Sequence, residues 1–252
     1  MPRKLNPTES SSARTHSVVA AMKFWSRFKH PPPMLAFTFA EPAESVADSQ
    51  EALNRLPSVL SDDSVVYSLR ISLDDSKPSV WRRVLVKAAN LEVLHHIIQL
   101  TMGWNDSHLH GFEIRRTRVP LVEDGAAIDE RAISIAQLHA AHIKKFRYTY
   151  DFGDDWRHTI VIEDACAASP TILYPQCVDG KGIAPLEDIG GMRNWSSLLD
   201  AIRHPEKERE EEIDALLGRL GPDFSPLAFD LAKINLRLQR AFNKRLRGKG
   251  RA

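Results

Sequence analysis

Apolar and polar residues alternate strictly from Tyr67 to Leu73, and this run limits the possible folds more than any other feature. Successive side chains of a β-strand point to opposite faces, so the run predicts a strand that is buried on one face only. Residues 74–78 contain Asp, Ser and Pro and form a turn before a second apolar run at residues 80–86. Such a close return favours an antiparallel hairpin, and with it an antiparallel sheet.

The rest of the pattern adds both strands and helices. Asn90 can cap a helix that runs to about Met102, where Gly103 ends it. We expect further strands at residues 108–114, 145–152 and 156–163, and further helices at residues 134–142, 196–203, 205–217 and 227–242. Strands and helices that do not alternate regularly argue for an α+β fold, in which helices pack on an antiparallel sheet.

The composition excludes several classes of protein. Lys and Arg number 34 and Asp and Glu number 33, so we do not expect a nucleic-acid binder that is basic over its whole surface. Two cysteines, Cys166 and Cys177, are too few for a disulfide scaffold and suit a reducing compartment. No apolar run approaches the ~18 residues that a membrane-spanning helix needs. We therefore expect a cytoplasmic protein without membrane association.

Three regions of the chain differ in composition. Residues 1–63 are rich in Ser, Pro and Ala and lack a periodic apolar pattern, which predicts a disordered, low-complexity extension. Within it, aromatic and basic residues gather at residues 23–30, which could be a docking segment instead. Residues 64–242 form the expected α+β domain, and residues 243–252 form a basic tail without acidic residues. Basic tails can make weak, non-specific contacts with nucleic acid, which is therefore one partner to consider.

His108 and His110 are candidate metal ligands. They stand two residues apart on a predicted strand, so their imidazoles share one face of the sheet. Neutral imidazole is a common ligand of divalent metal ions. The alternative is a pair of histidines hydrogen-bonded at the edge of the core, because Phe112 and Ile114 continue the same face.

The tip of the predicted hairpin at residues 148–158 carries a second set of candidates. Asp151, Asp154 and His158 lie there among four aromatic rings. Gly153 and one Asp are explained by the turn itself, and the aromatic rings could simply pair across the strands. The functional interpretation is a ligand-binding or metal-binding surface, with Asp154 and His158 as ligands and Asp151, Asp154 and His158 as catalytic groups.

A glycine-rich loop at residues 175–191 contributes Cys177, Glu187 and Asp188 as further catalytic candidates. Long loops without secondary structure are often functional, although a buried, inert thiol with ordinary turn residues explains the sequence as well. If these side chains converge with the histidines, a divalent metal ion would activate water and a carboxylate would act as base. The common nucleotide-binding loops and hydrolase motifs are absent from the sequence.

Several blocks in order resemble the plasmid pRiA4b ORF-3-like family, which includes TnpR-type passenger proteins of insertion elements. The blocks are residues 67–73, 77–83, 103–104, 108–112, 148–158 and 187–191. The resemblance covers about residues 64–240 and implies a bacterial protein with an α+β domain, an association with plasmids and mobile elements, and no established activity. Two details depart from the family pattern, Leu186 in place of a second Pro and Asn194-Trp195 in place of Gly-Tyr.

Three functions remain open at this point. The first is an accessory binding module carried by mobile elements. The second is a metal-dependent or acid/base enzyme that uses the His, Asp, Cys and Glu cluster. The third is a nucleic-acid-associated protein that uses its basic tails. Recombinase activity, which the TnpR label suggests, is not expected because the recombinase serine motif is absent.

Overall fold

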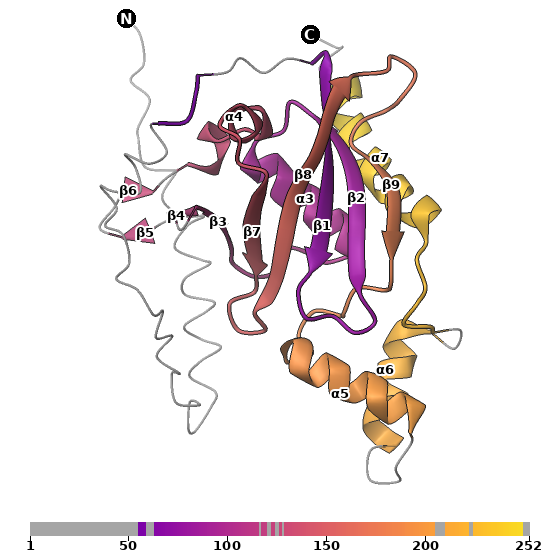
Figure 1. The fold of residues 1–252 in the computed structure, drawn as a ribbon. Coiled ribbons are helices and arrows are strands. Elements are labelled where there is room, and N and C mark those ends of the chain that lie inside the picture. Colours follow the sequence, from indigo (N-terminus) through magenta and orange to yellow (C-terminus); the bar gives the residue numbers. More distant parts are fainter. Residues whose placement is uncertain are drawn as a thin grey trace, which may run out of the picture. The chain divides into compact units, whose positions relative to one another are not determined.

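A seven-stranded antiparallel sheet forms the centre of the protein, as a computed structural model shows (Figure 1). The structure describes residues 55–58, 63–115, 117–119, 122–123, 126–127, 129–204, 210–221 and 224–248. The strand order is β4-β3-β7-β8-β1-β2-β9. The strands are β1 (Val65–Leu73), β2 (Val80–Lys87), β3 (His110–Ile114), β4 (Thr117–Val119), β7 (Lys145–Tyr150), β8 (Trp156–Ala167) and β9 (Gln176–Lys181). A separate small hairpin consists of β5 (Val122–Glu123) and β6 (Ala126–Ala127).

The predicted alternation explains the central strands. In β1 the side chains of Leu69, Ile71 and Leu73 are buried and those between them are only half-buried. β1 pairs antiparallel with β2 on one side and with β8 on the other. The polar residues therefore face away from the core, as a half-buried strand requires.

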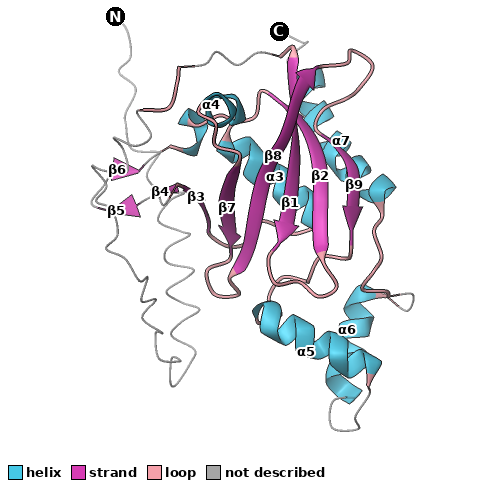
Figure 2. Cartoon of the chain, in the orientation of Figure 1, coloured by secondary structure: helices cyan, strands magenta, loops and turns pink. Residues whose placement is uncertain are grey.

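Helices cover one face of this sheet, and in the view of Figure 2 α3 and α7 pass behind the strands. The helices are α3 (Leu91–Met102), α4 (Ile135–Ala140), α5 (Gly191–Arg203), α6 (Glu210–Leu220) and α7 (Leu231–Gly248), with a 3₁₀ turn η1 (Glu130–Ala132). The Asn90 side chain accepts a hydrogen bond from the Val93 N–H and begins α3, and Gly103 ends it in a left-handed conformation. The α+β fold with helices packed on an antiparallel sheet is confirmed.

Some predicted boundaries differ from the structure. β9 occupies part of the segment that we expected to be a loop without secondary structure, and it pairs with β2 at the edge of the sheet. α7 begins at Leu231 rather than at residue 227, because the Asp230 side chain accepts a hydrogen bond from the Lys233 N–H. It continues to Gly248, into the segment expected as a basic tail.

The N-terminal region expected from composition lies largely outside the described residues. The N-terminal extension predicted over residues 1–63 is described only at 55–58 and 63, and the proposed docking segment at 23–30 is not described. Among the helices of the described ranges, none has the combination of length and apolar character that crossing a bilayer demands.

Candidate functional site

Three polar side chains converge where the β7–β8 hairpin meets the segment before β3 and the loop before α5. His108 precedes β3, Asp151 follows β7, and Asp188 stands in the loop. The His108 Nε2 lies 2.9 Å from Asp188 Oδ1 and 3.6 Å from Asp151 Oδ2. Together these three residues can offer ligand atoms that all lie within 4.8 Å of one another. We call this set the His108 group.

Hydrogen bonds within the hairpin turn orient the Asp151 carboxylate. Its Oδ1 accepts from the Gly153 N–H at 3.0 Å and from the Asp154 N–H at 3.3 Å, and Oδ2 is left to face His108. Asp151 and Asp188 both have left-handed backbones, with φ of 54° and 58°. Asp adopts this conformation in turns more readily than most residues other than glycine.

Asp154 fixes the loop that carries Asp188. The Asp154 Oδ2 accepts hydrogen bonds from the Ile189 and Gly190 N–H groups, both at 3.2 Å, at the start of α5. Gly191 makes the close approach possible, because a Cβ atom there would lie 2.6 Å from the Asp154 carbonyl oxygen. Burial and the nearby Asp151 raise the pKa of Asp154. Asp154 therefore positions the loop and is not a member of the His108 group.

Glu187 is held by the structure in a similar way. Its Oε2 accepts from both the backbone and the side-chain nitrogen of Asn105 at 2.8 Å, and its Oε1 accepts from the Tyr150 hydroxyl. Tyr150 in turn accepts from the Ser107 N–H at 2.9 Å. With both oxygens engaged, Glu187 ties the loop to β7 and to the segment after α3.

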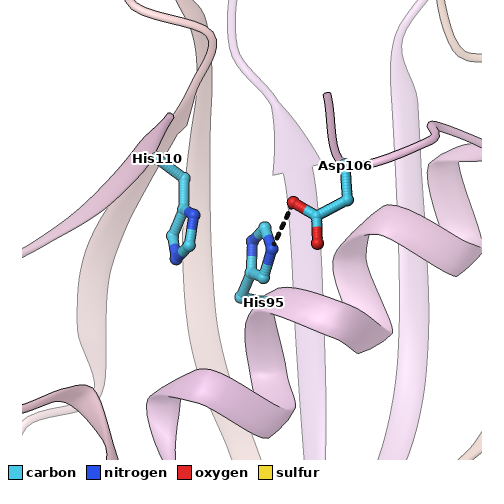
Figure 3. A group of neighbouring side chains, drawn as sticks. All are labelled: His95, Asp106 and His110. Carbon is cyan, nitrogen blue, oxygen red and sulfur yellow. Dashed lines mark hydrogen bonds and ion pairs between the residues drawn. The ribbon is translucent and has the colours of Figure 1, made fainter. Parts of the chain in front are cut away.

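A second group of side chains lies beside the first and contains His95, Asp106 and His110 (Figure 3). The His95 Nε2 lies 2.8 Å from Asp106 Oδ1, and its Nδ1 lies 2.8 Å from the Tyr148 hydroxyl. The rings of His95 and His110 are stacked with centroids 3.5 Å apart and an interplanar angle of 6°.

This second group is a hydrogen-bond network and not a good metal site. Both nitrogens of His95 have partners, and the lone pairs of two stacked rings point in parallel directions that do not meet at one ion. The His110 Nε2 is also engaged, with Glu130 Oε2 at 3.1 Å. Burial first, and then the neighbouring His110, lower the pKa of His95, so its ring is neutral at pH 7 and donates from Nε2 to Asp106.

In the His108 group, by contrast, the imidazole nitrogen that faces the carboxylates is not engaged in a hydrogen bond. The His108 Nε2 is shielded from solvent and makes no hydrogen bond, although it lies 2.9 Å from Asp188 Oδ1. Neighbouring ligand atoms around a tetrahedral ion with ~2.1 Å bonds lie about 3.4 Å apart. The distance from His108 Nε2 to Asp188 Oδ1 (2.9 Å) is shorter than this value, and the distance to Asp151 Oδ2 (3.6 Å) is longer. One imidazole and two carboxylates without hydrogen bonds between them therefore suit a divalent cation.

Two of the predicted site residues lie elsewhere. His158 is fully buried beside Tyr148, its Nδ1–H donates to the Trp156 carbonyl at 3.0 Å, and burial lowers its pKa to about 3. Cys177 is a buried residue of β9, and burial raises the pKa of its thiol to about 11. Neither belongs to the His108 group or to the second group.

The sequence candidates thus separate instead of forming one site. His108, Asp151 and Asp188 come together, Asp154 and Glu187 support them, and His110 belongs to the neighbouring network. His95 and Asp106, which also belong to that network, were not predicted as site residues from the sequence. A signal for His95 was present, because a histidine stands on the apolar stripe of α3, four residues after Leu91.

Comparisons with known proteins agree on one family. The family model described as plasmid pRiA4b ORF-3-like protein matches residues 65–233. The uncharacterised protein y4hQ of Sinorhizobium fredii (strain NBRC 101917 / NGR234) is 33% identical over 175 residues, which cover 68% of this chain and 89% of that protein. The crystal structure of MM3350, a protein of unknown function from Methanosarcina mazei Go1, matches with a TM-score of 0.61 and 30% identity, covering 68% of this chain and 97% of that one. The chain therefore belongs to the plasmid pRiA4b ORF-3-like family.

Proposed function

We propose that this protein binds a divalent metal ion at the His108 group and acts as a metal-dependent hydrolase. The observation that carries the proposal is the shielded His108 Nε2, which makes no hydrogen bond and faces the carboxylates of Asp151 and Asp188. Mixed nitrogen and oxygen ligands suit ions such as Zn²⁺ or Mn²⁺.

The surrounding residues support this role. Asp151 is fixed by the backbone N–H groups of its own turn, as outer contacts commonly fix a metal ligand. The Asp188 side chain is 70% exposed, so solvent and a small ligand can reach the site from that side. Three protein ligands leave coordination positions open, and a bound ion would supply Lewis acidity and an activated water there.

Titration of the metal-free protein with Zn²⁺ and with Mn²⁺, followed by calorimetry, tests the metal site. We expect one ion per chain, and at least tenfold weaker binding in His108→Ala and in Asp151→Asn because each removes one ligand. His204→Ala is the matched control, since His204 is exposed at the end of α5. Equal affinity in the His108 variant and the control would refute the site.

A turnover assay separates an enzyme from a binding module. Metal-dependent hydrolysis of a chromogenic phosphoester that disappears in Asp151→Asn would support the hydrolase. Stoichiometric metal without turnover of such esters would favour the accessory binding module. An accessory role on plasmids or mobile elements is part of the proposal, and the family description, which names a plasmid protein, supports the association with plasmids.

A further inference from the structure

A cavity of about 530 Å³ opens beside the His108 group. Ser107, Glu187 and Asp188 lie in its wall, so the cavity reaches the residues that border the proposed metal site. The end of α3, the segment before α5 and the first turns of α7 form much of the remainder. Its volume lies within the range of ~300–1,000 Å³ that is typical of small-molecule sites.

Four cationic side chains line this cavity: Arg82, Arg219, Lys233 and Arg237. Arg82 is the most enclosed of them and is only 3% exposed. Its Nε donates to the Thr101 carbonyl, and its Nη1 donates to the carbonyls of Trp81 and Lys181. Within the described part of the chain, its Nη2 makes no hydrogen bond and is left for a ligand.

Arg237 brings a second guanidinium to the same place. It approaches Gly103 so closely that a Cβ atom there would lie 2.6 Å from its Nη1. Burial, with a contribution from Arg237, lowers the pKa of Arg82 to about 10, so Arg82 is still charged at pH 7. Two like charges that share a partly buried place repel one another unless an anion lies between them.

Three acidic residues also line the cavity, so its lining has one more cationic than acidic side chain. Glu187 is engaged with Tyr150 and Asn105, Asp188 lies against His108, and the Asp230 Oδ1 accepts from the Lys233 backbone N–H. Arg219 donates to the Glu187 carbonyl oxygen. Among the described residues, no ion pair joins Lys233 or Arg237 to a carboxylate, so an anionic ligand can take that place.

We propose that this cavity binds a small molecule that bears a phosphate group, held by Arg82, Lys233 and Arg237. The fork of a guanidinium matches the oxygens of phosphate, and three cations suit a doubly charged anion. The phosphate site rests on the cavity alone. That a phosphoester is the substrate of the adjacent metal rests, in addition, on the proposed function.

Calorimetry on the full chain after removal of metal tests the phosphate site, with inorganic phosphate and phenyl phosphate as probes. We expect binding of both, and at least tenfold weaker binding in Arg237→Met, because the substitution removes a charged hydrogen-bond donor to the phosphate. Arg240→Met is the matched control on the exposed side of α7. Lys233→Met is a second variant at an exposed position, where loss of folding is not expected.

Each outcome decides one proposal. Equal phosphate binding in Arg237→Met and Arg240→Met, or no binding by the unaltered protein at millimolar phosphate, would overturn the phosphate site. Benzoate binding as tight as phenyl phosphate would overturn its preference for phosphate. Arg237→Met should bind metal as tightly as the unaltered protein does. If the unaltered protein binds phosphate but no metal, the proposed function is refuted and the phosphate site stands.

Discussion

Burial keeps the His158 ring neutral at pH 7. The ring is fully buried beside Trp104 and Tyr148, and burial lowers its pKa to about 3. An unfolded histidine has a pKa of ~6.5, so between these values the unfolded chain binds one more proton than the folded protein. The stability that the neutral ring contributes is complete above pH ~6.5 and is lost as the pH falls toward 3.

Replacing His158 by Asn should reduce this pH dependence, because the amide does not titrate and can still donate to the Trp156 carbonyl. Between pH 6 and pH 5 the free energy of unfolding of the unaltered protein should fall by about 1 kcal/mol more than that of the variant. Urea unfolding at the two pH values measures the difference. Parallel losses in the two proteins would show that His158 does not titrate in this way.

Gly191 is a second single residue on which the site depends. Its φ is +76°, and a Cβ atom would lie 2.6 Å from the Asp154 carbonyl oxygen. Gly191→Ala should therefore lower the free energy of unfolding by more than about 1 kcal/mol and weaken metal binding, since the loop carries Asp188.

Gly218 provides the matched comparison, and thermal melting of both variants is the measurement. It lies within α6, and a Cβ atom there would meet nothing within 4 Å. Gly218→Ala should stabilise the protein by about 0.5–1 kcal/mol, because alanine is the better helix former. Stabilisation by both substitutions would contradict the close approach at Gly191.

At the scale of the elements, the sequence predicted the strands and turns whose structure depends on residues close together in the chain. The alternation in β1 and β2 and the turn residues between β7 and β8 specify their structure within short segments. β9 was missed because Asp179 and Gly180 resemble turn residues, and its strand conformation depends on pairing with β2. The convergence of Asp151 and Asp188 with His108 was anticipated only in outline, because it requires the loop to reach the hairpin through Asp154.

The contact between α7 and β9 leads to a prediction at this scale. The Asn235 side chain accepts from the Cys177 N–H at 2.9 Å and donates to the Cys177 carbonyl at 2.8 Å. Asn235→Ala leaves both backbone groups without these partners and should cost about 1–3 kcal/mol in urea unfolding. Gln239→Ala, at an exposed position of the same helix, should have almost no effect. Similar stability of the two variants would mean that the contact does not hold α7 to the sheet.

At the scale of the whole molecule, the proposed metal site connects segments that are far apart in the sequence. His108 stands before β3, Asp151 in the hairpin and Asp188 before α5, so the three ligands meet only in the folded chain. An ion that binds the folded state and not the unfolded chain stabilises the fold by mass action. Metal binding at the proposed site would therefore stabilise the domain.

The melting temperature should accordingly rise with metal concentration. At one hundred times the dissociation constant the stabilisation is about 2.7 kcal/mol, which corresponds to roughly 5–10 °C for a domain of this size. Thermal melting with chelator and with increasing Zn²⁺ or Mn²⁺ measures the shift. Asp151→Asn should show at most about half of this shift, because tenfold weaker binding leaves a stabilisation of about 1.4 kcal/mol at the same metal concentration. His95→Ala should melt lower without metal and still show the full shift, because His95 belongs to the hydrogen-bond network. If the melting temperature of Asp151→Asn rises with metal as much as that of the unaltered protein, the ion binds elsewhere. If only His95→Ala loses this rise, the ion binds at the second group.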